Sequence, residues 1–134
     1  KELMTMNSFD IDGVIYMGNG LAGVKPQYGD IIVTGRSFQE EEETKAMLRD
    51  MGIHNKVYYN SLPFERKTRE SSGKHKANIL NNFEGEITIH FEDDPVQIAV
   101  IKKYCPWLNV VHLNHNLTEK ENVRHGLRKT TEQG

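Results

Sequence analysis

The chain has little of several features that mark common protein classes. Cysteine occurs once, at Cys105, which excludes an intramolecular disulfide and fits a reducing compartment such as the cytoplasm. No apolar run approaches the roughly 18 residues of a membrane-spanning helix, and the first residues lack the apolar core of a signal peptide. Charge is nearly balanced at −2, so no overall positive charge draws the protein to nucleic acid or to a membrane.

The composition that remains is typical of one folded domain. The chain has 134 residues, of which 37% are hydrophobic and 27% are charged. A chain of this size can bury a core without disulfides or structural metals. We therefore expect a single domain over residues 1–134, with a polar and loosely ordered tail over 118–134, and the sequence leaves the oligomeric state open.

The order of apolar and amphipathic segments predicts an α/β fold. The expected strands cover residues 4–9, 30–34, 56–60, 86–91 and 109–113. Expected helices cover 37–52, a stretch ending near residue 82, and 95–104, with a glycine-rich loop over 13–29 and a polar irregular segment over 61–73. This alternation predicts a five-stranded parallel sheet covered by helices on both faces.

Polar residues gather where these strands end, which is where parallel sheets bind ligands. They are Asp10 and Asp12 after the first expected strand, Thr34, Gly35 and Arg36 after the second, and Glu92, Asp93 and Asp94 after the fourth. Lys74 and Lys76 lie just before and inside the helix that precedes the fourth strand. Carboxylates with a nearby lysine favour a hard cation such as Mg²⁺ together with an anion, and the chain has no cysteine or histidine spacing typical of zinc.

Four short motifs carry a family resemblance. They are FDIDGVI at 9–15, IIVTGR at 31–36, SGKHKANIL at 72–80 and FEDDP at 91–95. Each motif is a weak signal alone, but the four in this order resemble the haloacid dehalogenase superfamily of phosphatases and phosphotransferases. The resemblance spans residues 9–95 and implies a Rossmann-like three-layer α/β/α sandwich that hydrolyses phosphate monoesters with Mg²⁺ through an aspartyl-phosphate.

The resemblance also implies a role for each motif residue. Asp10 would be the nucleophile, and Asp12 would protonate the leaving oxygen and then activate water. Thr34 would hydrogen-bond a phosphoryl oxygen with help from the Gly35 amide, and Arg36 would bind substrate phosphate beside them. Lys76 would neutralise charge on the nucleophile and the phosphoryl group. Lys74 is the alternative to Lys76, which we favour because its spacing to the apolar helix residues is similar to that of the family lysine.

The metal assignment rests on the same resemblance. Asp93, helped by Asp94, would complete a Mg²⁺ shell begun by Asp10, and the backbone carbonyl of Asp12 would also contact the ion. An alternative for Asp94 is a helix cap, since Asp before Pro with Gln97 three residues on is a good helix start.

Plainer interpretations exist for the other site residues. Asp10 and Asp12 could be turn residues, and the segment from Thr34 to Arg36 could be an ordinary strand-to-helix turn. Glu92 is expected to face away from the site, because neighbouring strand residues point to opposite sides. The six histidines show no ligand spacing and are expected to be structural or exposed.

The spacing of the motifs bears on the substrate. The short gap between Asp12 and Thr34 leaves room for a flap but not for an inserted helical cap, and the gap between Arg36 and Lys76 is also too short for a second cap. The chain therefore resembles the superfamily members that have no cap domain, whose open sites suit large substrates.

A basic segment at residues 66–76 suggests a class of substrate. Its basic residues are Arg66, Lys67, Arg69, Lys74 and Lys76, opposed by one acid, Glu70. Such a segment could bind nucleotide phosphates or a phosphodiester backbone, or it could be a solvated basic loop. We therefore expect a phosphatase for nucleotides or nucleic-acid ends. The alternatives are a non-catalytic module that binds a phosphorylated partner, or a phosphotransferase to an acceptor other than water.

Overall fold

A five-stranded parallel sheet forms the centre of the molecule in a computed structural model that describes residues 5–115. The strand order is β5-β4-β1-β6-β7. The strands are β1 (Met6–Phe9), β4 (Ile31–Ser37), β5 (Val57–Asn60), β6 (Ile87–Glu92) and β7 (Asn109–His112). The five-stranded parallel sheet predicted from the sequence is confirmed, whereas the predicted tail over 118–134 lies outside the described residues.

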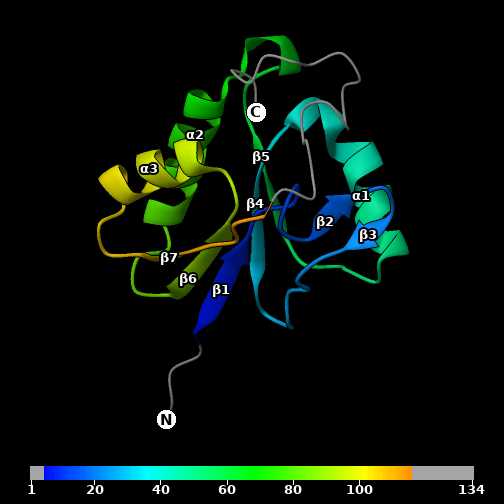
Figure 1. The fold of residues 1–134 in the computed structure, drawn as a ribbon, viewed down its shortest axis with the longest axis horizontal. Coiled ribbons are helices and arrows are strands. Elements are labelled where there is room, and N and C mark those ends of the chain that lie inside the picture. The colour runs from blue at the N-terminus through cyan, green and yellow to red at the C-terminus, as the bar shows by residue number, and fades with distance from the viewer. Residues whose placement is uncertain (1–4, 116–134) are drawn as a thin grey trace.

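Helices cover both faces of the sheet, which gives three layers (Figure 1). On one face lie α2 (Arg69–Asn81) and α3 (Pro95–Tyr104), and on the other lies α1 (Glu41–Asp50). A small antiparallel hairpin of β2 (Tyr16–Gly18) and β3 (Leu21–Ala22) lies beside α1. This hairpin occupies part of the segment that the sequence predicted to be loop.

Strand β4, next to the central strand β1, supplies side chains to two separate cores. Ile31 and Val33 pack in the layer of α2 and α3, whereas Ile32 between them packs in the layer of α1. Successive side chains of a strand point to opposite faces, so an entirely apolar strand requires cover on both. In this way the short apolar run of β4 determines the three-layer arrangement.

Two capping boxes begin the helices that flank the site. The Ser37 hydroxyl accepts a hydrogen bond from the Gln39 amide, and the Glu40 carboxylate accepts one from the Ser37 amide. This box opens a short 3-10 turn, η1 (Phe38–Glu40), and α1 follows. The helix start predicted at Ser37 is confirmed, although β4 continues through Gly35 rather than ending before it.

The second box lies where the sequence predicted irregular structure. Thr68 and Ser71 cap each other, so α2 begins at Arg69 and a 3-10 turn, η2 (Phe64–Arg66), precedes it. The prediction of an irregular segment over 61–73 is therefore wrong in its last part, because the first turn of α2 is polar and lacks an apolar pattern. A Cβ at Gly73 would lie 2.9 Å from Val100 Cβ, so glycine allows α2 to pack closely on α3.

None of the helices within residues 5–115 is both long enough and apolar enough to cross a membrane.

Candidate functional site

The centre of the candidate site is Asp10, directly after β1. The register pairs Ser8 with His90 and Phe9 with Phe91, and the Asp10 amide donates to the Phe91 carbonyl at 3.1 Å. Asp10 therefore lies beside Glu92 at the carboxyl end of the sheet. Its side chain is almost completely buried, so its charge requires a partner inside the protein.

Lys76 of α2 supplies that partner. Its Nζ atom donates to Asp10 Oδ1 and to Glu92 Oε1, both at 2.9 Å, and the lysine is 1% exposed. Removing one member of such a buried ionic group would leave an uncompensated charge. The predicted choice of Lys76 over Lys74 agrees with this geometry, since Lys74 is exposed on the outer side of α2.

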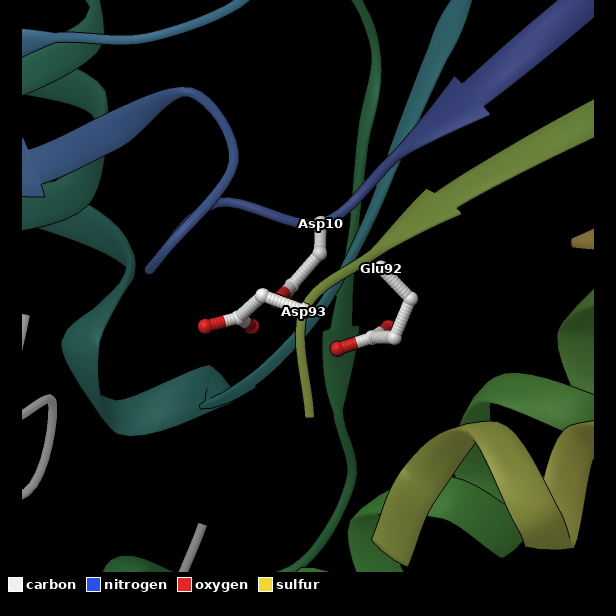
Figure 2. Close-up of side chains that lie close together, drawn as sticks. All are labelled: Asp10, Glu92 and Asp93. Atoms are coloured by element: carbon white, nitrogen blue, oxygen red, sulfur yellow. The ribbon is translucent and has the colours of Figure 1, made fainter. Parts of the chain in front are cut away.

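Asp93 joins Asp10 and Glu92 to form a cluster of three carboxylates (Figure 2). One oxygen from each lies within 4.8 Å of the others, which is close enough to share a cation. Gly13 makes this possible, because a side chain there would collide with the Asp93 carboxylate and its φ of 91° disfavours other residues. Carboxylate oxygens alone suit Mg²⁺ or Ca²⁺ rather than softer metals.

Asp12 lies across the site from Lys76 and pairs with Arg36. Arg36 Nε donates to Asp12 Oδ2 at 2.9 Å and Nη2 donates to Oδ1 at 2.7 Å, so the guanidinium fork holds both carboxylate oxygens. A third nitrogen, Nη1, donates to the buried Thr44 hydroxyl at 3.0 Å. Arg36, predicted to bind substrate phosphate, thus contacts a carboxylate of the protein.

The electrostatics of Arg36 follow from this contact. Burial alone would lower the pKa of the guanidinium, but the charge of Asp12 and its hydrogen bonds outweigh that effect. More distant attraction to Glu43 and Asp10 adds to it, and the net result raises the pKa of Arg36 above its ordinary value. Arg36 is therefore a permanent positive charge next to Asp12.

Thr34 and Gly35 directly precede Arg36 and are buried in β4. The Thr34 hydroxyl accepts a hydrogen bond from the Arg36 amide at 3.0 Å. The Gly35 carbonyl accepts one from Lys67 Nζ at 2.9 Å. Lys67 is completely buried and also lies 3.7 Å from Glu40, so it fastens the loop before α2 to the end of β4.

Asp94 has the capping role that the sequence left open. Its carboxylate accepts from the Val96 amide at 2.9 Å and from the Gln97 side chain at 3.0 Å, and it pairs with Arg69 of α2. The three-carboxylate cluster does not include it. The structure thus assigns Asp94 to the start of α3, and the metal-ligand prediction for Asp94 lacks support from this geometry.

The basic segment at 66–76 does not form a surface patch. Lys67 and Lys76 are buried, and Arg69 donates to Asp94. Only Arg66 and Lys74 of its five basic residues are exposed. Neither interpretation, a phosphate-binding segment or a solvated loop, fits the segment as a whole, because Lys67, Arg69 and Lys76 contact the Gly35 carbonyl, Asp94 and Asp10 of the protein itself.

Sequence reasoning missed Glu92, which was expected to face away. β6 extends one residue further than predicted, through Glu92, and alternation then puts Glu92 on the same face as His90. Ser8 and Asp10 alternate in the same way beside them on β1. This pairing of Ser-x-Asp with His-x-Glu on two strands was the available signal.

A cavity of about 420 Å³ lies between α1 and the edge strand β5. Its floor includes the buried Leu48 and Ile53, and three exposed basic side chains line it, Lys45, Arg49 and Lys56. Burial and the charge of Glu41 raise the pKa of Tyr59 in this cavity, while Arg36 acts in the opposite direction. None of the site residues lines this cavity, but Arg36 contacts Thr44 of the same helix α1.

The chain was compared with models of protein families, with curated proteins and with solved structures, and none of them matches it. The case for a function therefore rests on the residues and their geometry.

Proposed function

We propose that this protein is a Mg²⁺-dependent phosphatase of the haloacid dehalogenase type that works through an aspartyl-phosphate. The observation that carries the proposal is the position of Asp10. It lies buried at the carboxyl end of the central strand, hydrogen-bonded to Lys76 and clustered with Asp93. A carboxylate held in this way can attack phosphorus while neighbouring positive charge offsets the negative charge that accumulates.

The reaction has two steps that balance in protons and bonds. An Asp10 oxygen attacks the phosphorus atom, the bond from phosphorus to the ester oxygen breaks, and Asp12 gives that oxygen a proton. Water then attacks the phosphorus of the acyl phosphate, Asp12 takes a proton from the water, and inorganic phosphate leaves as Asp10 is restored. Asp12 must carry a proton at the start of this cycle, whereas a carboxylate that accepts from Arg36 with both oxygens has none to give. Asp12 must therefore first exchange Arg36 for a proton from solvent, and the second step then returns it to this protonated state.

Asp10 and Asp93 would hold Mg²⁺, with Glu92 as a third carboxylate within reach. The ion supplies positive charge that lets the carboxylates and a phosphate dianion approach one another. Lys76 keeps Asp10 Oδ1 in place, and Thr34 in β4 is the candidate donor to a phosphoryl oxygen.

The proposed substrates are nucleotides or nucleic-acid ends. Between Asp12 and β4 the chain forms only the β2–β3 hairpin, which supports a flap and the assignment to members without a cap domain. Exposed cations are present at Arg66 and Lys74 on the α2 side of the sheet, and at Lys45, Arg49 and Lys56 around the cavity between α1 and β5. Such surface charge favours a substrate with more than one phosphate.

The test is phosphate release from an aryl phosphate with and without Mg²⁺, followed by a panel of nucleotides and phosphorylated oligonucleotides. Asp10→Asn should abolish the activity, whereas Asp50→Asn, which removes the same charge from the exposed end of α1, should leave it unchanged. Equal activity of wild type and Asp10→Asn would overturn the proposal. Binding of phosphorylated ligands without turnover would favour a binding module, and transfer to an added alcohol would indicate a phosphotransferase.

A further inference from the structure

Two buried polar residues next to the site have no role in the mechanism above. Ser8 and His90 are paired in the register of β1 and β6, and both are 0% exposed. Strand positions of this kind usually carry apolar side chains, and a polar side chain buried there requires a hydrogen-bond partner.

The partners form one continuous chain of hydrogen bonds that leads to Asp10. Ser8 Oγ lies 2.7 Å from His90 Nδ1, and His90 Nε2 lies 3.0 Å from Glu92 Oε1. The same Glu92 oxygen accepts from Lys76 Nζ at 2.9 Å, and Lys76 reaches Asp10 at 2.9 Å. All the residues of this hydrogen-bonded series are buried.

The chemistry of these groups assigns the direction of each hydrogen bond. An ionised carboxylate only accepts, so His90 donates to Glu92 from Nε2. In the neutral imidazole Nδ1 is then an acceptor, and the Ser8 hydroxyl donates to it. The Glu92 carboxylate thus selects the Nε2–H tautomer of His90, and the Ser8 hydroxyl, which can donate or accept, satisfies the other ring nitrogen.

We propose that Ser8 and His90 are positioning residues that hold the Glu92 carboxylate and, through it, Lys76 in place beside Asp10. This inference rests on the proposed phosphatase function. Lys76 divides its contacts between two carboxylates, and a Glu92 free to rotate would take the ammonium group with it. Outer hydrogen bonds of this kind orient the groups that perform the chemistry.

The sharpest test is a pair of substitutions at one position. In His90→Gln the amide nitrogen lies about where Nε2 lies and still donates to Glu92, whereas the shorter side chain of His90→Asn reaches only toward Ser8. We expect kcat on the aryl phosphate to fall about 10- to 100-fold in His90→Asn and much less in His90→Gln, with KM nearly unchanged in both. Ser8→Ala should lower kcat by a smaller factor.

Cys105→Ala provides the stability control. It removes a buried thiol that donates to the Ala77 carbonyl in the core beneath α2 and is not one of the hydrogen-bonded residues from Ser8 to Asp10. We expect it to lower the melting temperature without changing kcat. Equal losses of kcat in His90→Asn and His90→Gln, or no loss in either, would overturn the inference. If His90→Asn does not fold, the kcat of Ser8→Ala tests the inference instead. An unchanged kcat in Ser8→Ala contradicts it.

Heteronuclear NMR of the histidine rings separates this inference from the proposed function. It should show the Nε2–H tautomer of His90 in wild type and, because Nδ1 loses its partner, a shift of the Nδ1 resonance in Ser8→Ala, whether or not the protein is active. If wild type releases no phosphate from any substrate, the proposed function fails even where the spectrum shows this tautomer. A His90 protonated at Nδ1 alone overturns the positioning chain even if the enzyme is active.

Discussion

The two sides of the site neutralise their aspartates in different ways. On the α2 side, Lys76 places one ammonium group between Asp10 and Glu92 and contacts one oxygen of each. On the α1 side, Arg36 places a planar fork on both oxygens of Asp12. Lysine acts as a point charge that several carboxylates can share, whereas arginine fits a single carboxylate in a fixed geometry.

This difference matches the roles proposed for the two aspartates. A nucleophile needs a neighbouring cation that offsets its charge and stays in place during attack, and contact through Oδ1 alone leaves Lys76 in position throughout. A group that transfers protons must change partners in every cycle, so Asp12 has to exchange Arg36 for the leaving group and then for water. The comparison therefore predicts a rigid α2 side and a mobile pair on the α1 side.

The largest expected effect comes from Lys76→Met. This change leaves Asp10 and Glu92 buried next to each other without their shared cation, which should cost about 3–5 kcal/mol of unfolding free energy. Activity should be lost, and denaturant unfolding with phosphate-release assays measures both effects. Lys74→Met is the matched control two residues away, and because Lys74 is exposed we expect its stability to change by less than about 0.5 kcal/mol. Similar losses of stability in Lys76→Met and Lys74→Met would contradict the prediction that the α2 side is rigid.

Arg36→Lys tests the α1 side. Lysine keeps the charge but loses the two-pronged contact with Asp12 and the bond to Thr44, so stability should fall by about 1–3 kcal/mol. We expect kcat to fall by about tenfold, because Asp12 would no longer return to one position after each proton transfer. An Arg36→Lys variant with wild-type kcat would show that a point charge suffices on this side as well.

The sequence predicted the α2 side better than the α1 side. Asp10 follows an expected strand and Lys76 precedes apolar helix positions, so both were found from local patterns. The contact between Arg36 and Asp12 depends on how closely α1 and the loop after β1 approach, which is a tertiary distance that no local pattern contains. For the same reason Lys67 was assigned to the surface although it is completely buried.

Two polar residues of the sheet show what an apolar strand pattern does not contain. Ser8 interrupts the apolar pattern of the first expected strand, yet its hydroxyl bonds to His90 inside the sheet. Glu92 was expected on the wrong face because alternation was applied between it and Asp93, which lies beyond the end of β6 and does not follow the alternation. Such local departures from a regular pattern tend to occur at functional sites, where polar groups replace core side chains.

The charge of Lys76 also affects a neighbouring histidine. Burial, with repulsion from Lys76, lowers the pKa of His75 to about 4, although a hydrogen bond with the Tyr59 backbone acts in the opposite direction. An unfolded chain would protonate this histidine near pH 6.5. Between pH 6.5 and 4 the unfolded state therefore binds more protons, so stability falls as the pH falls through this range.

We expect His75 to account for about 2 kcal/mol of the stability lost between neutral pH and pH 5. The His75→Gln variant should lose about that much less stability between the two pH values. Urea unfolding at neutral pH and at pH 5 measures this difference. In Lys76→Met the effect should shrink but persist, because burial is the larger cause. Parallel pH profiles for wild type and His75→Gln would contradict this account of the α2 side.

The smallest expected effect concerns the surface of the two sides. Both sides bury a cation beside an aspartate, Lys76 next to Asp10 and Arg36 next to Asp12, but on the α1 side exposed cations also line a cavity, the one beside β5. The double variant Lys45→Ala/Arg49→Ala should therefore raise KM for a phosphorylated oligonucleotide by about 3- to 5-fold, an effect that shrinks with added salt. KM for a small aryl phosphate should not change, because a small substrate does not extend beyond the catalytic groups.

The control for the cavity variant removes two positive charges from the opposite face of the sheet, where α3 lies. Lys102 and Lys103 are exposed near the end of α3, so Lys102→Ala/Lys103→Ala changes the net charge equally without touching the cavity. If both double variants raise KM for the oligonucleotide alike, only the total charge of the protein matters. If only the cavity variant does so, the polyanionic substrate extends along α1, on the side where Arg36 must release Asp12. A long substrate could then assist that release, because its phosphates would compete with Asp12 for the guanidinium of Arg36.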